Sequence, residues 1–180
     1  MKFITPAVLF CLTMTCVLLA QDVKNTSYIS STGEKVLRIE STVRARREEV
    51  WNLFASEQGL RKWIAPVVSL DLRVGGQILT NYDSAKSVSD LGTIRLPILN
   101  YLEFEMITLK VILNEHFAHS VRDEDQNLQE IIQLVDAGNG QTKIVSSMIG
   151  WGKGAEWERT YDFFARGNEW TMRNLTKVFR

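Results

Sequence analysis

The chain has 180 residues, of which 45% are hydrophobic, and its 21 basic and 21 acidic residues give a formal net charge of zero at pH 7. This length suits one domain with a single well-filled core. A neutral chain offers no basic surface field for nucleic acid or for an anionic membrane, so we expect no nucleic-acid partner.

The first twenty residues, MKFITPAVLFCLTMTCVLLA, have the organisation of a secretory signal peptide. Lys2 gives a positive start, an apolar run covers residues 8–19, and Ala20 precedes polar residues. We therefore predict a signal peptide over residues 1–20 and a secreted or periplasmic protein. An uncleaved N-terminal membrane anchor is the alternative, and after cleavage we expect no stable membrane insertion.

Both cysteines, Cys11 and Cys16, lie in this segment, so the predicted mature protein contains none. It would have no disulfide, no thiol nucleophile and no thiolate metal ligand. Residues 21–34, QDVKNTSYISSTGE, are polar and lack apolar periodicity. We expect them to form a flexible leader to a domain that spans residues 35–180.

The domain begins with KVLRIESTVRA, in which apolar and polar residues alternate as in a half-buried strand. The next stretch, RREEVWNLFASEQGLRKWIAP, has apolar residues at helical spacings. It predicts two short helices, broken near residues 56–59 and stopped by Pro66. VVSLDLRVGGQILTNYDS then predicts a hairpin whose first strand runs to Val74 and whose turn contains Gly75 and Gly76.

The following segments predict further strands and one long helix. They are a short strand in GTIRLPIL, a longer one in YLEFEMITLKVIL, and a hairpin in NLQEIIQLVDAGNGQTKIVSSMIGW with its turn at AGNG. After Gly154, apolar residues recur at threes and fours, which predicts an amphipathic helix of roughly twenty-five residues. Because strands are consecutive and helices segregated, the predicted fold class is α+β with an antiparallel sheet.

The glycines of GWGKGAEWERTYDFF raise the question of a phosphate-binding loop. Such loops have the spacing G-x-x-x-x-G-K-[ST] or G-x-G-x-x-G between a strand and a helix. Here the spacing is G-x-G-x-G, with bulky Trp151 inside it and Ala155 where a hydroxyl would be needed. We therefore predict that Gly150, Gly152 and Gly154 let the chain turn from the last strand into the long helix.

The same stretch resembles the motif G-W-G-x-G-x-E-W-x-x-x-Y-x-(F/Y)-F of the START-like (SRPBCC) superfamily. The resemblance is to the group homologous to the activator of the ninety-kilodalton heat-shock chaperone ATPase. EEVWNLFASEQGLRKWIAP resembles the helix pair of that group, and LRVGGQI resembles its strand–turn–strand segment. The resemblance covers residues 35–180. It implies a helix-grip fold, in which a curved antiparallel sheet wraps around the long C-terminal helix and leaves an elongated apolar cavity.

The resemblance makes that cavity the expected ligand site. Aromatic residues that only pack in a hydrophobic core occur at the same helical spacing. For every candidate, the alternative role is therefore core packing without ligand contact. Trp157 and Tyr161 are favoured, because a buried indole or phenol needs a polar partner. The candidates for the lining are Trp51, Phe54, Trp63, Tyr82, Phe104, Met106, Trp157, Tyr161 and Phe164.

The sequence gives little support to catalysis or to metal binding. The two histidines lie in NEHFAHSVRDEDQ, and we interpret this acidic stretch as a solvated loop between two strands. We expect no catalytic residue, no metal and no cofactor. Metal ligation is the alternative for six side chains: His116, His119, Glu115, Asp123, Glu124 and Asp125.

Two functions from different classes follow. The first is an exported, non-catalytic domain that binds a small hydrophobic molecule in the cavity. The second, implied by the resemblance, is a co-chaperone that stimulates a chaperone ATPase. The predicted leader disfavours the second, because that chaperone class is chiefly cytosolic. A weaker third hypothesis is a cyclase or hydrolase with Tyr161 or His116 as the acid, which lacks a base of evident position.

Overall fold

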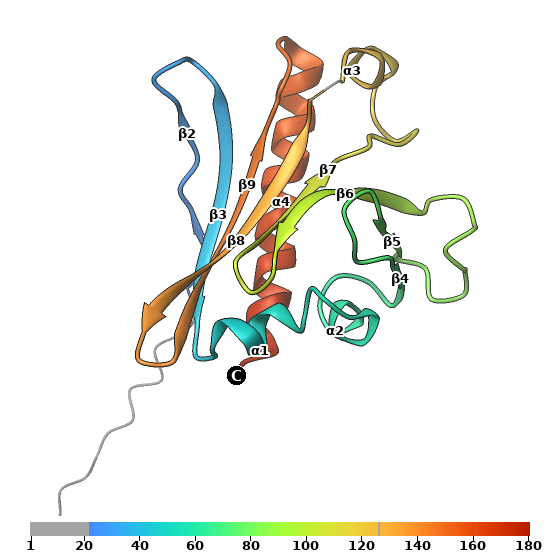
Figure 1. Cartoon of the computed structure of the whole chain (residues 1–180). Helices are drawn as coiled ribbons and strands as arrows, with labels where there is room; N and C mark the ends of the chain where they lie inside the picture. Colours follow the sequence, from blue (N-terminus) through green and yellow to red (C-terminus); the bar gives the residue numbers. More distant parts are fainter. Residues whose placement is uncertain (1–21, 126) are drawn as a thin grey trace, which may run out of the picture.

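A curved antiparallel sheet and a long C-terminal helix dominate the structure (Figure 1). The computed structural model describes residues 22–125 and 127–180, so the predicted signal peptide lies outside the described residues. The described strands are β1 Lys24–Asn25, β2 Tyr28–Ile29, β3 Lys35–Val43, β4 Val67–Leu70, β5 Gln77–Asn81, β6 Ile94–Leu102, β7 Met106–Lys110, β8 Gln129–Gly138 and β9 Gln141–Ile149. The described helices are α1 Arg47–Trp51, α2 Glu57–Arg61, α3 His119–Glu124 and α4 Ala155–Lys177.

The sheet brings the two ends of the domain together. Its strand order is β1-β3-β9-β8-β7-β6-β5-β4, with β2 also paired to β3, and every pairing is antiparallel. The first long strand therefore lies beside the last one, with Leu37 opposite Met148. Figure 1 shows α4 along the sheet, with its C-terminal end beside α1. This arrangement confirms the predicted α+β helix-grip fold.

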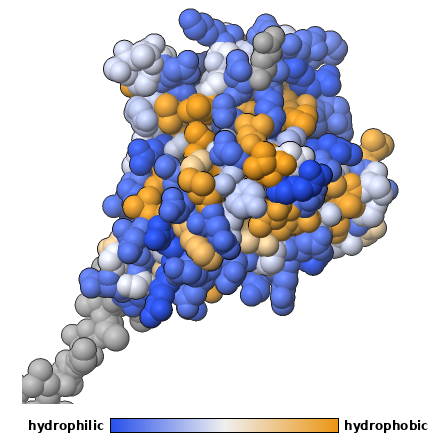
Figure 2. Space-filling model, viewed as in Figure 1, coloured by the Kyte–Doolittle hydropathy of each residue, from blue (hydrophilic) through white to orange (hydrophobic). Residues whose placement is uncertain are grey.

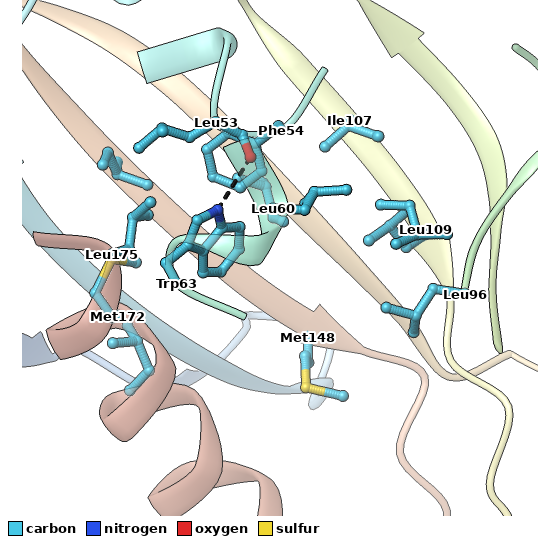
Figure 3. Close-up of a cluster of buried hydrophobic side chains, with 14 of the residues drawn as sticks. Leu53, Phe54, Leu60, Trp63, Leu96, Ile107, Leu109, Met148, Met172 and Leu175 are labelled. Atoms are coloured by element: carbon cyan, nitrogen blue, oxygen red, sulfur yellow. Dashed lines mark hydrogen bonds between the residues drawn. The ribbon is translucent and has the colours of Figure 1, made fainter. Parts of the chain in front are cut away.

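The main core lies between the sheet and the helices (Figure 3). Leu53 and Leu60 come from the α1–α2 region, Ile107 comes from β7, and Leu175 comes from α4; all four are at most 5% exposed. The indole Nε1 of Trp63 donates a hydrogen bond to the backbone oxygen of Leu53 at 3.0 Å, drawn as a dashed line in Figure 3. A buried indole thus has the polar partner that it requires.

Two short strands, β1 and β2, occupy the segment where we expected a flexible leader. They pair with β3, with Lys24 opposite Glu40 and Tyr28 opposite Val36. Between them, the amide of Thr26 donates to the carbonyl of Arg38 at 2.8 Å. Such edge pairing uses main-chain groups, which every residue carries, so a polar sequence without periodicity gives no sign of it.

The helix pair follows the prediction except at its break. The chain leaves the helical path at residues 52–56, and Ser56 caps α2 by accepting a hydrogen bond from the amide of Gly59 at 3.0 Å. Gly59 therefore lies inside α2 and does not interrupt it. A Cβ at this position would lie 2.2 Å from the backbone oxygen of Asn52, so the glycine permits a close approach of the two turns.

Several strand limits differ from the prediction. β4 ends at Leu70, because residues 71–76 form the turn and leave Val74 63% exposed. β6 is the longer of the next two strands, since the chain turns at residues 103–105 around Phe104, whose φ is 62°. α3 lies within the stretch for which we predicted only a loop.

The glycine motif permits close contacts at the start of α4. A Cβ on Gly152 would lie 2.1 Å from Nε1 of Trp157, and one on Gly150 would lie 2.2 Å from the backbone oxygen of Asn127. Trp157 is 3% exposed, and its Nε1 donates to Oε2 of Glu124 in α3 at 2.8 Å. The glycines therefore fit the predicted turn into the helix, with Gly152 giving room for the indole.

No helix in the described parts of the chain combines the length and the apolar content that crossing a membrane requires. On the face shown in Figure 2, hydrophobic surface gathers in patches among hydrophilic residues. The exposed large hydrophobic residues include Leu91, Ile112 and Phe163.

We predict that Trp157→Ala lowers the free energy of unfolding by about 3 to 5 kcal/mol, because it removes a buried ring and leaves a cavity. Asp162→Ala is the matched control on the same helix. Asp162 is exposed, so its removal should change stability by less than about 0.5 kcal/mol. Urea unfolding of both variants measures the difference. Equal and small losses would show that the sheet does not hold the first turns of α4.

Candidate functional site

Within the described residues, two adjoining voids lie between the sheet and α4. The larger cavity has a volume of about 500 Å³, and its lining comes from the end of β5 and the loop after it, from β6, from α4 and from the segment that follows β7. Its apolar side chains come mainly from β6, α4 and the segment after β7, whereas β5 contributes Thr80 and Asn81. The smaller cavity has a volume of about 60 Å³ and lies against the core near Phe54 and Leu175. Glu130 of β8 and Asn168 of α4 line both cavities, so the two voids adjoin at these side chains.

Four of the candidate residues line these cavities. Phe54 and Trp63 line the smaller cavity, where their rings pack edge to face with centroids 5.0 Å apart. Tyr82 and Phe164 line the larger cavity. Contact of these four residues with a ligand stays a prediction.

Three candidates belong to packing away from both cavities. Trp51 is 3% exposed, and its ring centroid lies 6.1 Å from that of Tyr101 and 6.3 Å from that of Phe104. Phe104 sits in the turn between β6 and β7, and Met106 opens β7 opposite Leu102. These residues line neither cavity and act as core or turn residues.

The two favoured candidates, Trp157 and Tyr161, also lie outside both linings. The polar partner of the Trp157 indole is Glu124, as described above. Tyr161 packs edge to face on Trp151 with centroids 5.0 Å apart, and Nζ of Lys35 lies 3.9 Å from the centre of its ring. The cation and the indole therefore occupy the surroundings of Tyr161 where a ligand was expected.

Glu130 is the feature of the site that the sequence analysis missed. On β8 it alternates with Ile132 and Leu134, both buried, and it therefore faces the helix side of the sheet. Ser146 Oγ on β9 donates a hydrogen bond to its Oε1 at 2.6 Å. Among the described residues, no ion pair includes Glu130 and no hydrogen bond reaches its Oε2.

Glu130 is half-buried as a whole residue, and the many protein atoms around its carboxyl group have a direct electrostatic consequence. Removal from water disfavours the charged form and raises the pKa of Glu130 above 4.5, while the hydrogen bond from Ser146 opposes the rise. The strand alternation in NLQEIIQLV was the available signal, because it places an acid among inward-facing apolar residues. An acid with a raised pKa that lines a cavity is a candidate for a functional residue.

Tyr82 and two charged side chains mark the mouth of the larger cavity. Tyr82 is 49% exposed as a whole residue, and its pKa is raised by the partial removal of its phenol from water and further by the negative charge of Glu130. Asp83 and Lys86, on the loop after β5, are exposed and also line the cavity. Their opposite charges leave the mouth without a strong net field.

An aromatic group closes the other side of the larger cavity. Phe117, which precedes α3, stacks on Phe164 of α4 with ring centroids 5.5 Å apart and an angle of 3° between the planes. Phe163 meets Phe117 edge to face at 5.2 Å. These contacts attach the segment before α3 to the long helix, so this wall is formed by packed rings.

The histidine-containing stretch is dispersed in the structure. His116 lines the mouth of the larger cavity, whereas Nδ1 of His119 lies 2.6 Å from Asp123 Oδ2 within α3. Glu124 accepts from Trp157, and Asp125 pairs with Lys110 at 3.0 Å. Residues 22–125 and 127–180 contain no group of three or more His, Cys, Asp or Glu side chains that could hold a metal ion.

The curved sheet, the long helix and the void between them define a helix-grip domain. Residues 44–180 match the family described as Activator of Hsp90 ATPase homolog 1-like protein, and the chain belongs to this family. This membership confirms the resemblance found in the sequence. No curated protein matches the chain in sequence.

Solved structures share the fold at low sequence identity. The crystal structure of CalU16 from Micromonospora echinospora has a TM-score of 0.62 and 15% identity, covering 89% of this chain and 84% of that chain. The solution structure of the Aha1 dimer from Colwellia psychrerythraea has a TM-score of 0.59 and 17% identity, covering 80% of this chain and 92% of that chain. The crystal structure of PFC0360w from Plasmodium falciparum, described as an HSP90 activator, has a TM-score of 0.52 and 13% identity, covering 79% of this chain and 94% of that chain.

We predict that Glu130→Gln stabilises the protein near pH 7 and that the gain disappears as the pH falls to about 4. With its pKa raised on folding, Glu130 binds more protons in the folded state than in the unfolded state between the two pKa values. Wild-type stability therefore falls as the pH rises through this window. Glutamine keeps an acceptor for Ser146 and has no charge to bury.

Urea unfolding between about pH 4 and pH 7 measures this effect, with Glu103→Gln as the matched control because Glu103 is exposed. The control should not show the same change with pH. A Glu130→Gln protein that is less stable than wild type near pH 7 would contradict the burial of an unpaired carboxyl.

Proposed function

We propose that this protein binds a small hydrophobic molecule in the larger cavity and acts by binding rather than by catalysis. The observation that supports this proposal most directly is the void of about 500 Å³ between the sheet and α4. Ligand sites are concave, mostly apolar and supplied with few polar groups. Leu96 and Val111, at most 9% exposed, contribute apolar surface to it. Membership in the family supports the fold and leaves the ligand open.

Two parts of the cavity wall hold their shape by sheet pairing and by ring packing. Ile94 of β6 lies opposite Thr80 of β5, and both line the larger cavity. On the other side, Phe164 is fixed by its stack on Phe117. Because these two parts of the wall are pre-formed, a ligand would lose little affinity to ordering them.

We predict that the neutral fluorescent probe N-phenyl-1-naphthylamine binds the wild-type protein and that Ile94→Trp weakens this binding by about tenfold or more. The larger side chain would fill part of the void. Leu102→Trp is the matched control, because Leu102 ends the same strand, is 57% exposed and does not line the cavity.

Fluorescence titration gives the dissociation constant of each protein, and circular dichroism verifies that both variants fold. The control should bind within about twofold of wild type. Absence of probe binding by the wild type, or equal losses in both variants, would contradict a ligand site in the larger cavity.

We further propose that the protein works outside the cytoplasm, as the sequence of residues 1–20 predicts. The alternative is a co-chaperone that stimulates the ATPase of the ninety-kilodalton heat-shock chaperone. The family description and the HSP90 activator of Plasmodium falciparum favour that alternative. The two proposals differ in where the protein meets its partner.

N-terminal sequencing of the protein from its native source distinguishes them. We predict a first residue at or next to Gln21, which follows the expected cleavage point. When the purified native protein is added to the ninety-kilodalton chaperone, the ATPase rate of the chaperone should stay unchanged. A chain that still begins at Met1 and raises this rate would overturn export and support the co-chaperone function.

A further inference from the structure

Glu130 lies where a bound molecule would meet it. It lines both cavities, together with Asn168 of α4, so any ligand that extends from the larger cavity toward the core passes these two side chains. The neighbouring inward residues Ile132 and Leu134 of the same strand are at most 7% exposed and apolar. Glu130 therefore places a carboxyl group among apolar inward-facing neighbours on β8.

The protein leaves hydrogen-bond acceptors at this junction without partners. Ser146 Oγ donates a hydrogen bond to Oε1 of Glu130, and within the described residues no donor reaches Oε2. Asn168 uses its Nδ2 to donate to Sδ of Met148 at 3.2 Å, and no described group donates to its Oδ1. Two acceptor oxygens on facing elements suit a head group that carries several N–H donors.

The charge of the site favours a cation over a neutral donor. A half-buried carboxylate without a counter-ion is less well stabilised than one in water, and an opposite charge at hydrogen-bond distance offsets that loss. Lys86 also lines the larger cavity, but it is exposed, and Asp83 of the same loop carries the opposite charge. Glu130 is therefore the charge that acts on the interior.

We propose that the ligand is an amphipathic molecule with a protonated amine, which binds Glu130 and Asn168 while its apolar part fills the larger cavity. This inference rests on the proposed ligand-binding function and adds the chemistry of the head group. The raised pKa of Glu130 agrees with it, because an ammonium group would supply the counter-charge that the folded protein lacks.

The test uses three probes with the same ten-carbon chain: decylamine, decanol and decanoate. Each competes with N-phenyl-1-naphthylamine for the full protein near pH 7, below its micelle concentration. We expect decylamine to displace the fluorescent probe at a concentration about tenfold lower than decanoate, with decanol between them.

Glu130→Gln and Glu130→Met should both abolish this preference, to within about twofold, when each competitor is compared with the dissociation constant of the fluorescent probe measured for the same variant. The methionine variant removes the buried charge and fills a similar volume, so it is expected to fold even if the glutamine variant does not. Glu103→Gln, an exposed change, should keep the preference.

The outcomes separate the two proposals. Fluorescent-probe binding with equal displacement by all three compounds, or with a preference for decanoate, overturns the amine inference and leaves ligand binding intact. A preference for decylamine that survives in both Glu130 variants also overturns it. No binding of the fluorescent probe by the wild-type protein overturns the proposed function and the inference together.

Discussion

The structure depends on a mismatch of width between one helix and the sheet that it covers. A helix is about 10 Å across, and strands are spaced about 4.8 Å apart, so α4 can cover only two or three strands directly. It packs closely on β3, while α1 lies against β8 and β9. The inner faces of β5 and β6 are therefore only partly covered, and the larger cavity forms there.

The turn into α4 determines how that helix meets the sheet. Trp157 anchors the first turn through its hydrogen bond to Glu124, and Gly152 leaves the space that its indole needs. Trp151 ties the same turn to β9, because its Nε1 donates to the carbonyl of Met148 at 3.1 Å. The motif shared with the family thus fixes the helix in place, while the cavity side chains lie further along it.

The sequence predicted the elements whose signal is periodic. Alternation gave β3, helical spacing gave α4, and the AGNG turn between β8 and β9 has positive φ at Gly138, Asn139 and Gly140, as turn chemistry requires. Phe104 at φ 62° could not be foreseen, because a bulky residue rarely adopts that conformation.

The candidate site was predicted less well than the fold. Periodicity places a side chain on a face of its element, but it does not say whether a neighbouring ring fills the space in front of it. Tyr161 faces Trp151 and Lys35, whereas Phe164, three residues later, lines the larger cavity. The candidates were chosen for their large apolar side chains, so Glu130 was not among them. An acid at an inward-facing position between apolar residues was the more specific signal.

Membership in the family accounts for the architecture and leaves the use of the cavity to the side chains that line it. In this chain those side chains combine apolar surface with the carboxyl group of Glu130, which no described ion pair includes. Such a combination fits recognition of a ligand more readily than stability, since an apolar residue at the position of Glu130 would avoid the cost of burying a charge.

The most direct test of this account is a methyl nuclear magnetic resonance titration of the isoleucine-labelled protein with decylamine. Ile94 and Ile132 line the larger and the smaller cavity, whereas Ile29 on β2 is 62% exposed and distant in the fold from both linings. The account predicts that the signals of Ile94 and Ile132 shift in a saturable manner and that the signal of Ile29 does not. Shifts confined to exposed methyl groups, with Ile94 and Ile132 unchanged at saturation, would contradict a ligand site between the sheet and α4.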